Sequence, residues 1–347
     1  MGSTITLKTL ATELGVSTTT VSNAYSKPDR LSTELRQRIL DKADELGYCG
    51  PSAAGRALRS GRTDVCGYLF GGELSQAFSD PYSVIFLSGL SESVEQSGAS
   101  VLLVRALPEG QDNPLLDRAA IDALVVATPI GEHPGLQRVE RRGVRMVSTQ
   151  QSSTGDWVAI NDVKAGRLVG KHLARLGHRN VVVVMSDGCE RDTGLAEIAT
   201  EQILDGTRPV GTYELGRITG VCEKLPDASV RVVSAGRNTR EAGRAAAAYA
   251  LDDQFRPTAI VALSDVLALG VWDAVAERGL KPGRDVSIAG FDDIPDAGFL
   301  GITTVHQPIA EKGRLAGLLA MDPDYPDRQI LLPIELVVRA STGPAPK

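Results

Sequence analysis

Cysteine is scarce in this 347-residue sequence, and long apolar runs are missing from it. The four cysteines lie far apart with no C-x-x-C pair, so the sequence predicts reduced thiols rather than disulfides or zinc ligands. No stretch approaches the roughly 18 consecutive apolar residues of a membrane span. Because the N-terminus also lacks the basic-then-apolar order of a signal peptide, we expect a cytoplasmic protein with no membrane partner.

Motifs typical of enzymes are missing as well. The sequence contains no G-x-G-x-x-G dinucleotide motif and no G-x-S-x-G nucleophile motif. Residues 166–172, GRLVGKH, are similar to a phosphate-binding loop, but the glycine spacing is wrong and no Ser or Thr follows the lysine. The four histidines, at positions 133, 172, 178 and 306, show no metal-ligand spacing. We therefore predict no catalytic residue, no metal site and no cofactor.

Charge is distributed unevenly along the chain. The formal net charge is −6, yet residues 1–62 contain nine Lys and Arg against six Asp and Glu. These residues therefore carry +3 and the remainder −9. A basic segment on an acidic body is typical of a protein that contacts nucleic-acid phosphates with one end only. An ordinary solvated helical surface could also produce an excess of this size.

Residues 5–25, ITLKTLATELGVSTTTVSNAY, predict two short helices joined by a glycine turn. Apolar residues recur at helical spacing over 7–14, and Gly15 follows where a helix end commonly needs a left-handed backbone. Ser17 is a suitable N-cap for a second helix with few bulky side chains. The short polar outer face of that helix suits a DNA groove, although an ordinary helical hairpin has the same pattern.

A third helix is predicted to begin after Ser32 and to end at Gly47, because the apolar residues of TELRQRILDKADEL share one face. It completes a three-helix head of about fifty residues, which can just sustain a core of its own. The following segment, CGPSAAGRALRSGRT, is too short and too poor in apolar residues to form a stable helix alone. It is either a plain linker or a segment that orders only when bound.

From residue 65 onward, short apolar strands alternate with amphipathic helices. The predicted strands are 65–70, 100–106, 123–128, 144–149, 181–186, 230–235, 259–264 and 286–291. The predicted helices include 81–97, 162–176, 239–252, 266–278 and 308–320. This order predicts parallel sheets covered by helices on both faces, and the length favours two α/β subdomains over one. A boundary is expected near residues 150–157, where QQSSTGDW is polar and turn-rich.

Five segments, in this order along the chain, resemble the lactose- and galactose-repressor (LacI/GalR) family of bacterial transcription regulators. They are ITLKTLATELGVSTTTVSNAY, LGYCGPSAAGRALRSGRT, GRLVGKHLARLGHRNV, PTAIVALSDVLALGVWDAVAERGLKPGRDVSIAGFDD and ITTVHQPIAEKGRLAG. The resemblance runs nearly end to end and weakens between residues 187 and 229. It implies an all-α helix-turn-helix head plus an α/β core of two doubly wound parallel-sheet lobes, of the periplasmic-binding-protein type.

The resemblance also implies domain boundaries. The DNA-binding head is expected over residues 1–50 and a hinge helix or linker over 51–63. The core N-subdomain is expected over 64–150 plus about 306–328, and the core C-subdomain over 151–305 plus about 329–342.

By resemblance, the protein is expected to be a sequence-specific, ligand-controlled DNA-binding regulator, and a repressor. It is expected to bind, as a homodimer, a pseudo-palindromic double-stranded operator. The residues carried over by position are Thr18, Thr19 and Asn23 for base edges, with Ser17, Thr20 and Ser22 for phosphates. In the hinge, Leu58 holds the place of a leucine that enters the minor groove, and Arg56 is a further candidate for DNA contact.

The family's small-molecule effector binds between the two lobes, at the carboxyl ends of the strands. The matching residues here are Phe78, Ser79, Asp80, Arg191, Asn238, Asp265 or Ser264, Asp292 and Gln307, and Thr149 and Gln150 stand where the family commonly has Asp. Carboxylates, an amide and an arginine suit vicinal hydroxyls, so the predicted effector is a small sugar or cyclic polyol. Asp265 and Asp292 could instead cap the helix or turn after their strands.

Two alternatives remain open on sequence alone. Alternating strands and helices also fit a Rossmann-type enzyme, and the two-lobe core also fits a plain solute-binding protein, which would need a signal peptide in place of the basic head. Turnover of a nicotinamide cofactor would favour the enzyme. A steep loss of DNA affinity with added salt would favour the regulator.

Overall fold

The computed structural model describes residues 5–50, 57, 61–107, 111, 113–126, 134–187 and 194–346. The chain divides into two compact units, residues 1–63 and residues 64–347. The first unit contains the helical head, and the second contains two parallel-type sheets with their covering helices. In the part of the chain that is described, no helix is both long and apolar enough to cross a membrane.

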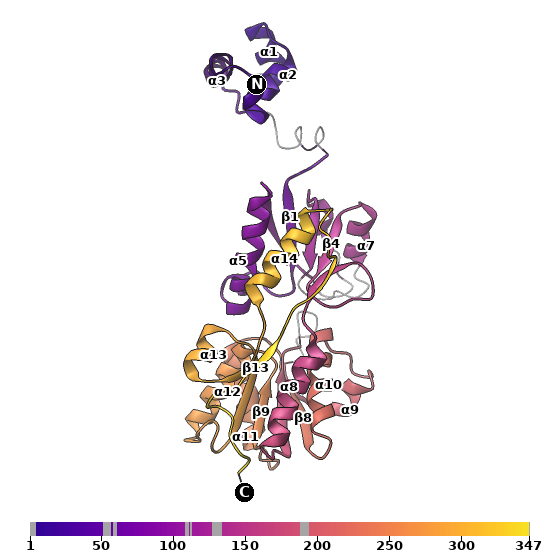
Figure 1. The fold of residues 1–347 in the computed structure, drawn as a ribbon, viewed down its shortest axis with the longest axis vertical. Coiled ribbons are helices and arrows are strands. Elements are labelled where there is room, and N and C mark those ends of the chain that lie inside the picture. The colour runs from indigo at the N-terminus through magenta and orange to yellow at the C-terminus, as the bar shows by residue number, and fades with distance from the viewer. Residues whose placement is uncertain are drawn as a thin grey trace. The chain divides into compact units, whose positions relative to one another are not determined.

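Three helices form the head, as the sequence predicts (Figure 1). They are α1 (Leu7–Leu14), α2 (Thr18–Ser26) and α3 (Thr33–Leu46), with a short 3-10 turn at Pro28–Arg30 between the last two. Local chemistry sets their ends: the hydroxyl of Ser17 accepts from the Thr20 backbone N–H at 3.0 Å, and Gly15 ends α1 with φ 67°. Their apolar faces close one core made of Leu10, Ala11, Val21, Ala24, Ile39, Ala43 and Tyr48.

The first lobe of the second unit is built on a sheet of parallel strands. Its order is β12-β5-β4-β3-β1-β2, with bounds β1 Val65–Phe70, β2 Ser100–Arg105, β3 Ala123–Val126, β4 Arg145–Ser148, β5 Asp156–Ala159 and β12 Gln329–Leu331. Its helices are α5 (Pro81–Gln96), α6 (Pro114–Arg118), α7 (Pro134–Arg141) and α14 (Ile309–Met321). Helices α5 and α14 lie side by side (Figure 1).

The second lobe has the sheet order β13-β11-β10-β9-β6-β8-β7. The strands are β6 Asn180–Met185, β7 Leu195–Ile198, β8 Ser229–Ala235, β9 Ala259–Ala262, β10 Ser287–Asp292, β11 Thr303–His306 and β13 Glu335–Val337. The edge strands β7 and β13 run antiparallel to their neighbours, and the strands between them are parallel. The helices are α8 (Asp162–Arg175), α9 (Thr200–Leu204), α10 (Thr212–Lys224), α11 (Arg240–Asp252), α12 (Asp265–Glu277) and α13 (Pro295–Leu300).

The predicted strands and helices of the core are present over their described residues, but the predicted lobe boundary is wrong in two places. Strand β5 pairs with β4, and β12 pairs with β5, so both belong to the first sheet rather than to the second lobe. The boundary was placed at QQSSTGDW because this segment is polar, although its last two residues begin β5. Only pairing with a neighbouring strand shows to which sheet so short a strand belongs. Strands β5, β7 and β11 and helices α6, α7, α9, α10 and α13 were not among the predicted elements.

The close approach of α8 and α10 requires glycine on both helices. A Cβ atom on Gly166 would lie 2.1 Å from the carbonyl oxygen of Arg217, and one on Gly220 would lie 2.1 Å from that of Val163. The GRLVGKH segment therefore lies within α8 as a packing surface, not as a phosphate-binding loop. This contact brings the first turn of α8 beside the middle of α10, where the candidate site forms.

Candidate functional site

Two surfaces are candidates for function, and the first is helix α2 of the head. Thr18 and Thr19 are exposed in its first turn, while Asn23 is partly exposed one turn further on. Ser17 and Thr20 hydrogen-bond each other through their side chains at 2.8 Å, so both hydroxyls already take part in the N-cap. The helix presents short polar groups at its start, which a base edge or a phosphate can approach closely.

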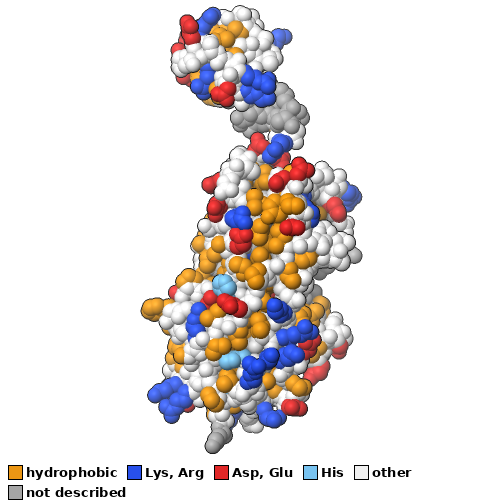
Figure 2. All heavy atoms as spheres, in the orientation of Figure 1, with side chains coloured by type: hydrophobic (Ala, Val, Ile, Leu, Met, Phe, Trp, Pro, Cys, Tyr) orange, Lys and Arg blue, Asp and Glu red, His pale blue; other side chains and the backbone are white. Residues whose placement is uncertain are grey.

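The charge of the head is mixed rather than uniformly basic. Figure 2 shows acidic and basic side chains side by side on its visible face. Lys42 pairs with Glu45 at 2.8 Å, and the Arg36 Nε donates to the Ala24 carbonyl at 3.2 Å. The basic excess is thus partly engaged inside the head. The predicted hinge residues Arg56 and Leu58 lie outside the described residues.

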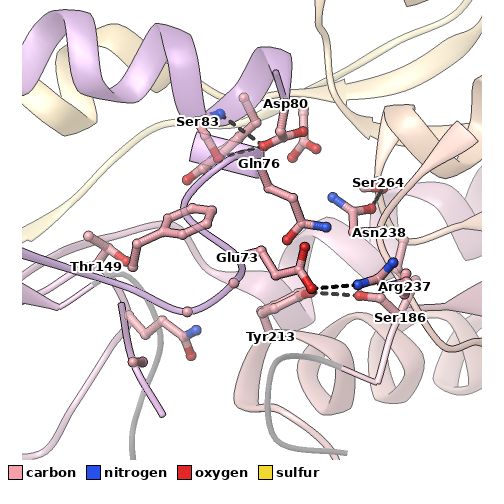
Figure 3. Close-up of a pocket in the computed structure, with 18 of the residues that line it drawn as sticks. Glu73, Gln76, Asp80, Ser83, Thr149, Ser186, Tyr213, Arg237, Asn238 and Ser264 are labelled. Atoms are coloured by element: carbon pink, nitrogen blue, oxygen red, sulfur yellow. Dashed lines mark hydrogen bonds and ion pairs between the residues drawn. The ribbon is translucent and has the colours of Figure 1, made fainter. Parts of the chain in front are cut away.

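The second candidate is a cavity of about 340 Å³ between the two lobes of the core. It lies at the carboxyl ends of the strands of both sheets, where parallel α/β proteins commonly bind ligands (Figure 3). Residues from the loops after β1, β4, β6, β8 and β9 form much of its wall, and α5, α8, α10 and α14 supply the rest. Its polar lining includes Glu73, Gln76, Asp80, Arg105, Thr149, Gln150, Asp162, Ser186, Arg217, Arg237, Asn238, Ser264, Asp292 and Lys312.

Several predicted effector residues line this cavity. Asp80, Asn238 and Asp292 do, and so does Ser264, the alternative to Asp265. The Ser264 hydroxyl donates to the Asn238 side-chain oxygen at 2.5 Å, which fixes the amide of Asn238 at the end of β8. Thr149 and Gln150, which follow β4, also lie in the wall.

Other predicted effector residues are wrong as direct lining residues. Phe78 and Ser79 do not line the cavity, because the 3-10 turn at Gln76–Phe78 directs the Gln76 side chain inward and leaves Phe78 73% exposed. Asp265 is fully buried, where it accepts from the Thr304 hydroxyl at 2.7 Å and the Ile294 N–H at 3.0 Å. Asp265 therefore stabilises the fold, and the cap of α12 is the hydroxyl of Ser264, which accepts from the Leu267 N–H at 3.2 Å. Arg191 lies outside the described residues.

Gln307 lies behind the residues that line the cavity. It does not line the cavity, and its side-chain nitrogen donates to Asp292 Oδ1 at 2.7 Å. Asp292 itself has φ 116°, a backbone conformation that residues other than glycine rarely adopt. Such strain persists only where the surrounding structure holds it, and here it aims a carboxylate at the cavity.

A buried arginine organises the floor of the cavity. Arg217 Nε donates to Asp162 at 2.9 Å, its Nη1 donates to the Leu263 carbonyl at 2.5 Å, and the same nitrogen lies 3.9 Å from Asp292. The guanidinium lies over the rings of Tyr213 and Phe291, at 5.0 and 4.6 Å from their centroids. Burial disfavours the charge, but Asp162 and Asp292 outweigh it and raise the pKa of Arg217. Arg217 therefore stays a fixed cation with donors near the cavity.

The pKa values of Asp292 and Lys312, which also line the cavity, are shifted toward neutrality. Burial raises the pKa of Asp292 to about 7, although Arg217 opposes the shift. Burial lowers the pKa of Lys312 to about 8, although Asp162 opposes that shift. The ammonium of Lys312 donates to the Tyr82 hydroxyl at 3.3 Å. The cavity thus combines carboxylates, amides and hydroxyls with arginine cations, an arrangement that can both accept from and donate to ligand hydroxyls.

Sequence reasoning missed Arg217 and Asp162, the two residues that make the floor. Asp162 follows Asn161, which caps α8 directly after β5 by accepting from the Lys164 N–H at 2.8 Å. The sequence contains a signal for Asp162, because an acidic residue just after a strand lies at the carboxyl edge of the sheet, where the ligand was expected. This signal was missed because β5 was not predicted as a strand. Arg217 left no such signal because it lies in mid-helix, and only the packing of α10 on α8 directs it inward.

Two family models match the chain. Residues 6–50 match the model for bacterial regulatory proteins of the lacI family, and residues 171–342 match a periplasmic binding protein-like domain. An HTH-type transcriptional regulator from Mycolicibacterium smegmatis is 35% identical over 98% of this chain and 96% of its own length. The head and the core thus each match a separate model, in the order that the structure shows.

Solved structures agree with this fold. A LacI-family transcriptional regulator from Corynebacterium glutamicum is 27% identical, with a TM-score of 0.71 over 98% of both chains. A ribose-bound LacI-family regulator from Enterococcus faecium is 22% identical, with a TM-score of 0.64 over 81% of this chain and all of its own. At 22% identity, the second match supports the fold alone.

Proposed function

The chain belongs to the LacI family of bacterial transcription regulators, and we propose that a small sugar or cyclic polyol bound between its core lobes controls how tightly its head binds operator DNA. The observation that carries the effector class is the Arg217, Asp162 and Asp292 cluster on the cavity floor. A fixed guanidinium flanked by carboxylates offers donors and paired acceptors in a desolvated place, as neighbouring ring hydroxyls require. The ribose bound in the Enterococcus faecium structure is a small sugar, the class proposed here.

The proposed mechanism is a shift between two arrangements of the core lobes. The cavity is lined by both lobes, so a ligand that contacts both favours the arrangement in which they are closer. If operator DNA prefers one arrangement, the ligand and the DNA affect each other's affinity by the same factor. No enzymatic step is needed, and the family consists of regulators rather than enzymes.

The experiment that tests this function measures operator binding with a panel of small molecules at fixed salt. DNA sites are first selected from a random library with the full-length protein. Affinity for the selected site is then measured with ribose, hexoses, cyclic polyols, nucleosides and sugar phosphates. We expect a sugar or polyol to change the operator affinity by about 5- to 150-fold, the usual range of allosteric coupling. Coupling confined to nucleosides would refute the proposed effector class.

Replacement of Asn23 by alanine is expected to weaken binding to the selected operator by about 1–3 kcal/mol, with less effect on random DNA. Asn23 lies on α2 with its amide partly exposed, and an amide can pair with the two polar atoms of an adenine edge. Titration of both DNA sequences by fluorescence anisotropy measures the difference. Gln37→Ala, an exposed amide on α3 that bonds Asp41 within the same helix, is the control and should change neither affinity. Equal losses on both DNA sequences would contradict base recognition by Asn23.

We further propose that the protein acts as a homodimer on a pseudo-palindromic operator. Two heads held together can occupy two half-sites, which one head alone cannot. Phe299 supports a contact between copies, because this large apolar side chain on α13 is 91% exposed.

Phe299→Lys is expected to raise the dimer dissociation constant about tenfold, since a buried aromatic residue often dominates an interface. Sedimentation at several protein concentrations measures this constant. Leu195→Lys is the control. Leu195 is also an exposed apolar residue, but it lies on β7 at one edge of the second sheet, whereas α13 connects β10 to β11 near the other edge. A purely monomeric wild-type protein would refute the homodimer.

A further inference from the structure

One ion pair joins the two lobes beside the cavity. Glu73 lies in the loop after β1 of the first lobe, and Arg237 lies in the loop after β8 of the second. Arg237 Nη2 donates to Glu73 Oε1 at 2.8 Å (Figure 3). The pair therefore bridges the two halves of the effector site, in contrast to the Arg217 and Asp162 pair, which lies within the second lobe.

Both side chains face the cavity and the solvent at the same time. Glu73 and Arg237 each line the cavity, yet they are 49% and 55% exposed. A side chain that contacts a cavity on one side and bulk water on the other stands at the opening between them. A ligand that fills the cavity and extends past this opening must displace the pair.

Tight local structure holds both residues in place. A Cβ atom on Gly72 would lie 2.5 Å from the Gln76 Oε1 and 2.9 Å from the Phe70 ring, so the loop before Glu73 is packed closely on its neighbours. The Gly236 N–H donates to the Ser234 hydroxyl at 3.0 Å, and the Arg237 N–H donates to the Ala235 carbonyl at 2.9 Å. Each charged group is thus presented by an ordered turn.

The volume of the cavity gives the pair a consequence for ligand size. About 340 Å³ is near the lower limit of small-molecule sites, which range from about 300 to 1,000 Å³. A monosaccharide or a cyclitol suits a site of this size with the pair in place. A disaccharide has nearly twice as many non-hydrogen atoms, and its second ring would need the space that Glu73 and Arg237 occupy.

We propose that Glu73 and Arg237 are specificity-determining residues that restrict the effector to a single polyol ring. This inference rests on the proposed function, since it describes how the proposed effector site selects among sugars. A half-exposed ion pair contributes little attraction by itself, so the selection comes mainly from the volume of the two side chains. Removal of the charge alone should therefore matter less than removal of the side chains.

The test compares ligand affinities of the full-length protein by calorimetry. The probes are ribose, glucose and myo-inositol as single rings, and cellobiose and sucrose as disaccharides. For the double variant Glu73→Ala with Arg237→Ala, we expect disaccharide affinity relative to single-ring affinity to rise at least tenfold. Arg237→Ala alone should shift the ratio in the same direction, while Glu73→Gln, which keeps the shape, should change it less than threefold.

A second ion pair provides the matched control. Arg244 and Glu277 join α11 to α12 at 3.2 Å with 51% and 53% exposure, but neither lines the cavity. Arg244→Ala with Glu277→Ala should leave the affinity ratio unchanged. An unchanged ratio in the Glu73 and Arg237 variant, or an equal change in the control, would overturn the size restriction while the proposed function stood. Tighter wild-type binding of disaccharides would overturn it too, and no binding of any probe would overturn the effector class together with it.

Discussion

Arg217→Met is expected to lower the free energy of unfolding by about 3–5 kcal/mol and to abolish the response to effector. The substitution keeps an apolar side chain at this position but removes the guanidinium that lies over the Tyr213 and Phe291 rings and that Asp162 and Asp292 share. An uncompensated buried charge accounts for a cost of this size. Urea denaturation followed by circular dichroism measures the stability, and calorimetry with the effector measures binding.

Two further variants separate charge compensation from simple loss of an arginine. Arg231→Met removes a partly exposed arginine that pairs with Asp253 at 3.2 Å and lies over the Phe255 ring, so its cost should be about 1 kcal/mol or less. Adding Asp292→Asn to Arg217→Met removes one of the two carboxylates left without a cation and should recover part of the stability. Equal losses for Arg217→Met and Arg231→Met would contradict the role assigned to the buried cluster.

The free energy of unfolding is expected to fall as the pH rises from about 5 to about 8, and Glu214 should account for up to about 3 kcal/mol of that fall. Glu214 is buried in the first turn of α10, and among the described residues its Oε2 has no hydrogen-bond partner. Burial raises the pKa of this carboxyl to about 7. The folded protein therefore holds the proton more tightly than the unfolded chain does. The resulting stabilisation is complete below the ordinary glutamate pKa and is lost as the pH passes about 7.

Glu214→Gln tests this dependence directly. The amide cannot ionise, so the variant should be more stable than the wild type at pH 8 and should show a smaller change between pH 5 and pH 8. Glu241→Gln, an exposed glutamate in the first turn of α11, is the control and should leave the pH dependence unchanged. A Glu214→Gln variant with the wild-type pH dependence would show that Glu214 does not ionise within this range.

Lys312 should produce the opposite dependence at higher pH. Burial lowers the pKa of its ammonium to about 8, so the folded protein releases that proton more readily than the unfolded chain does. The corresponding stability increases as the pH rises from about 8 toward the ordinary lysine pKa. Since Lys312 and Asp292 both border the cavity and have pKa values of about 8 and about 7, effector affinity should also depend on pH near these values.

The amino-acid sequence by itself determined the elements whose causes are local. Gly15 and Gly47 at the helix ends and Ser17 and Ser32 at the N-caps act on neighbouring backbone groups, and the structure confirms all four. The apolar strands of the core were likewise predictable from a few consecutive residues. Asp80, Asn238 and Asp292, which line the cavity, were indicated instead by resemblance to the family. Sequence periodicity and capping suffice wherever the partner lies within about one turn of the chain.

Only the tertiary structure decided which polar side chains meet in the cavity. Arg217 and Asp162 are 55 residues apart and meet because Gly166 and Gly220 let α8 and α10 approach closely. Phe78 points outward while Gln76 points inward, and Asp265 supports the fold while Asp292 faces the cavity. The wall of a cavity is assembled from distant segments, and side-chain direction there follows from packing, which local sequence patterns do not specify.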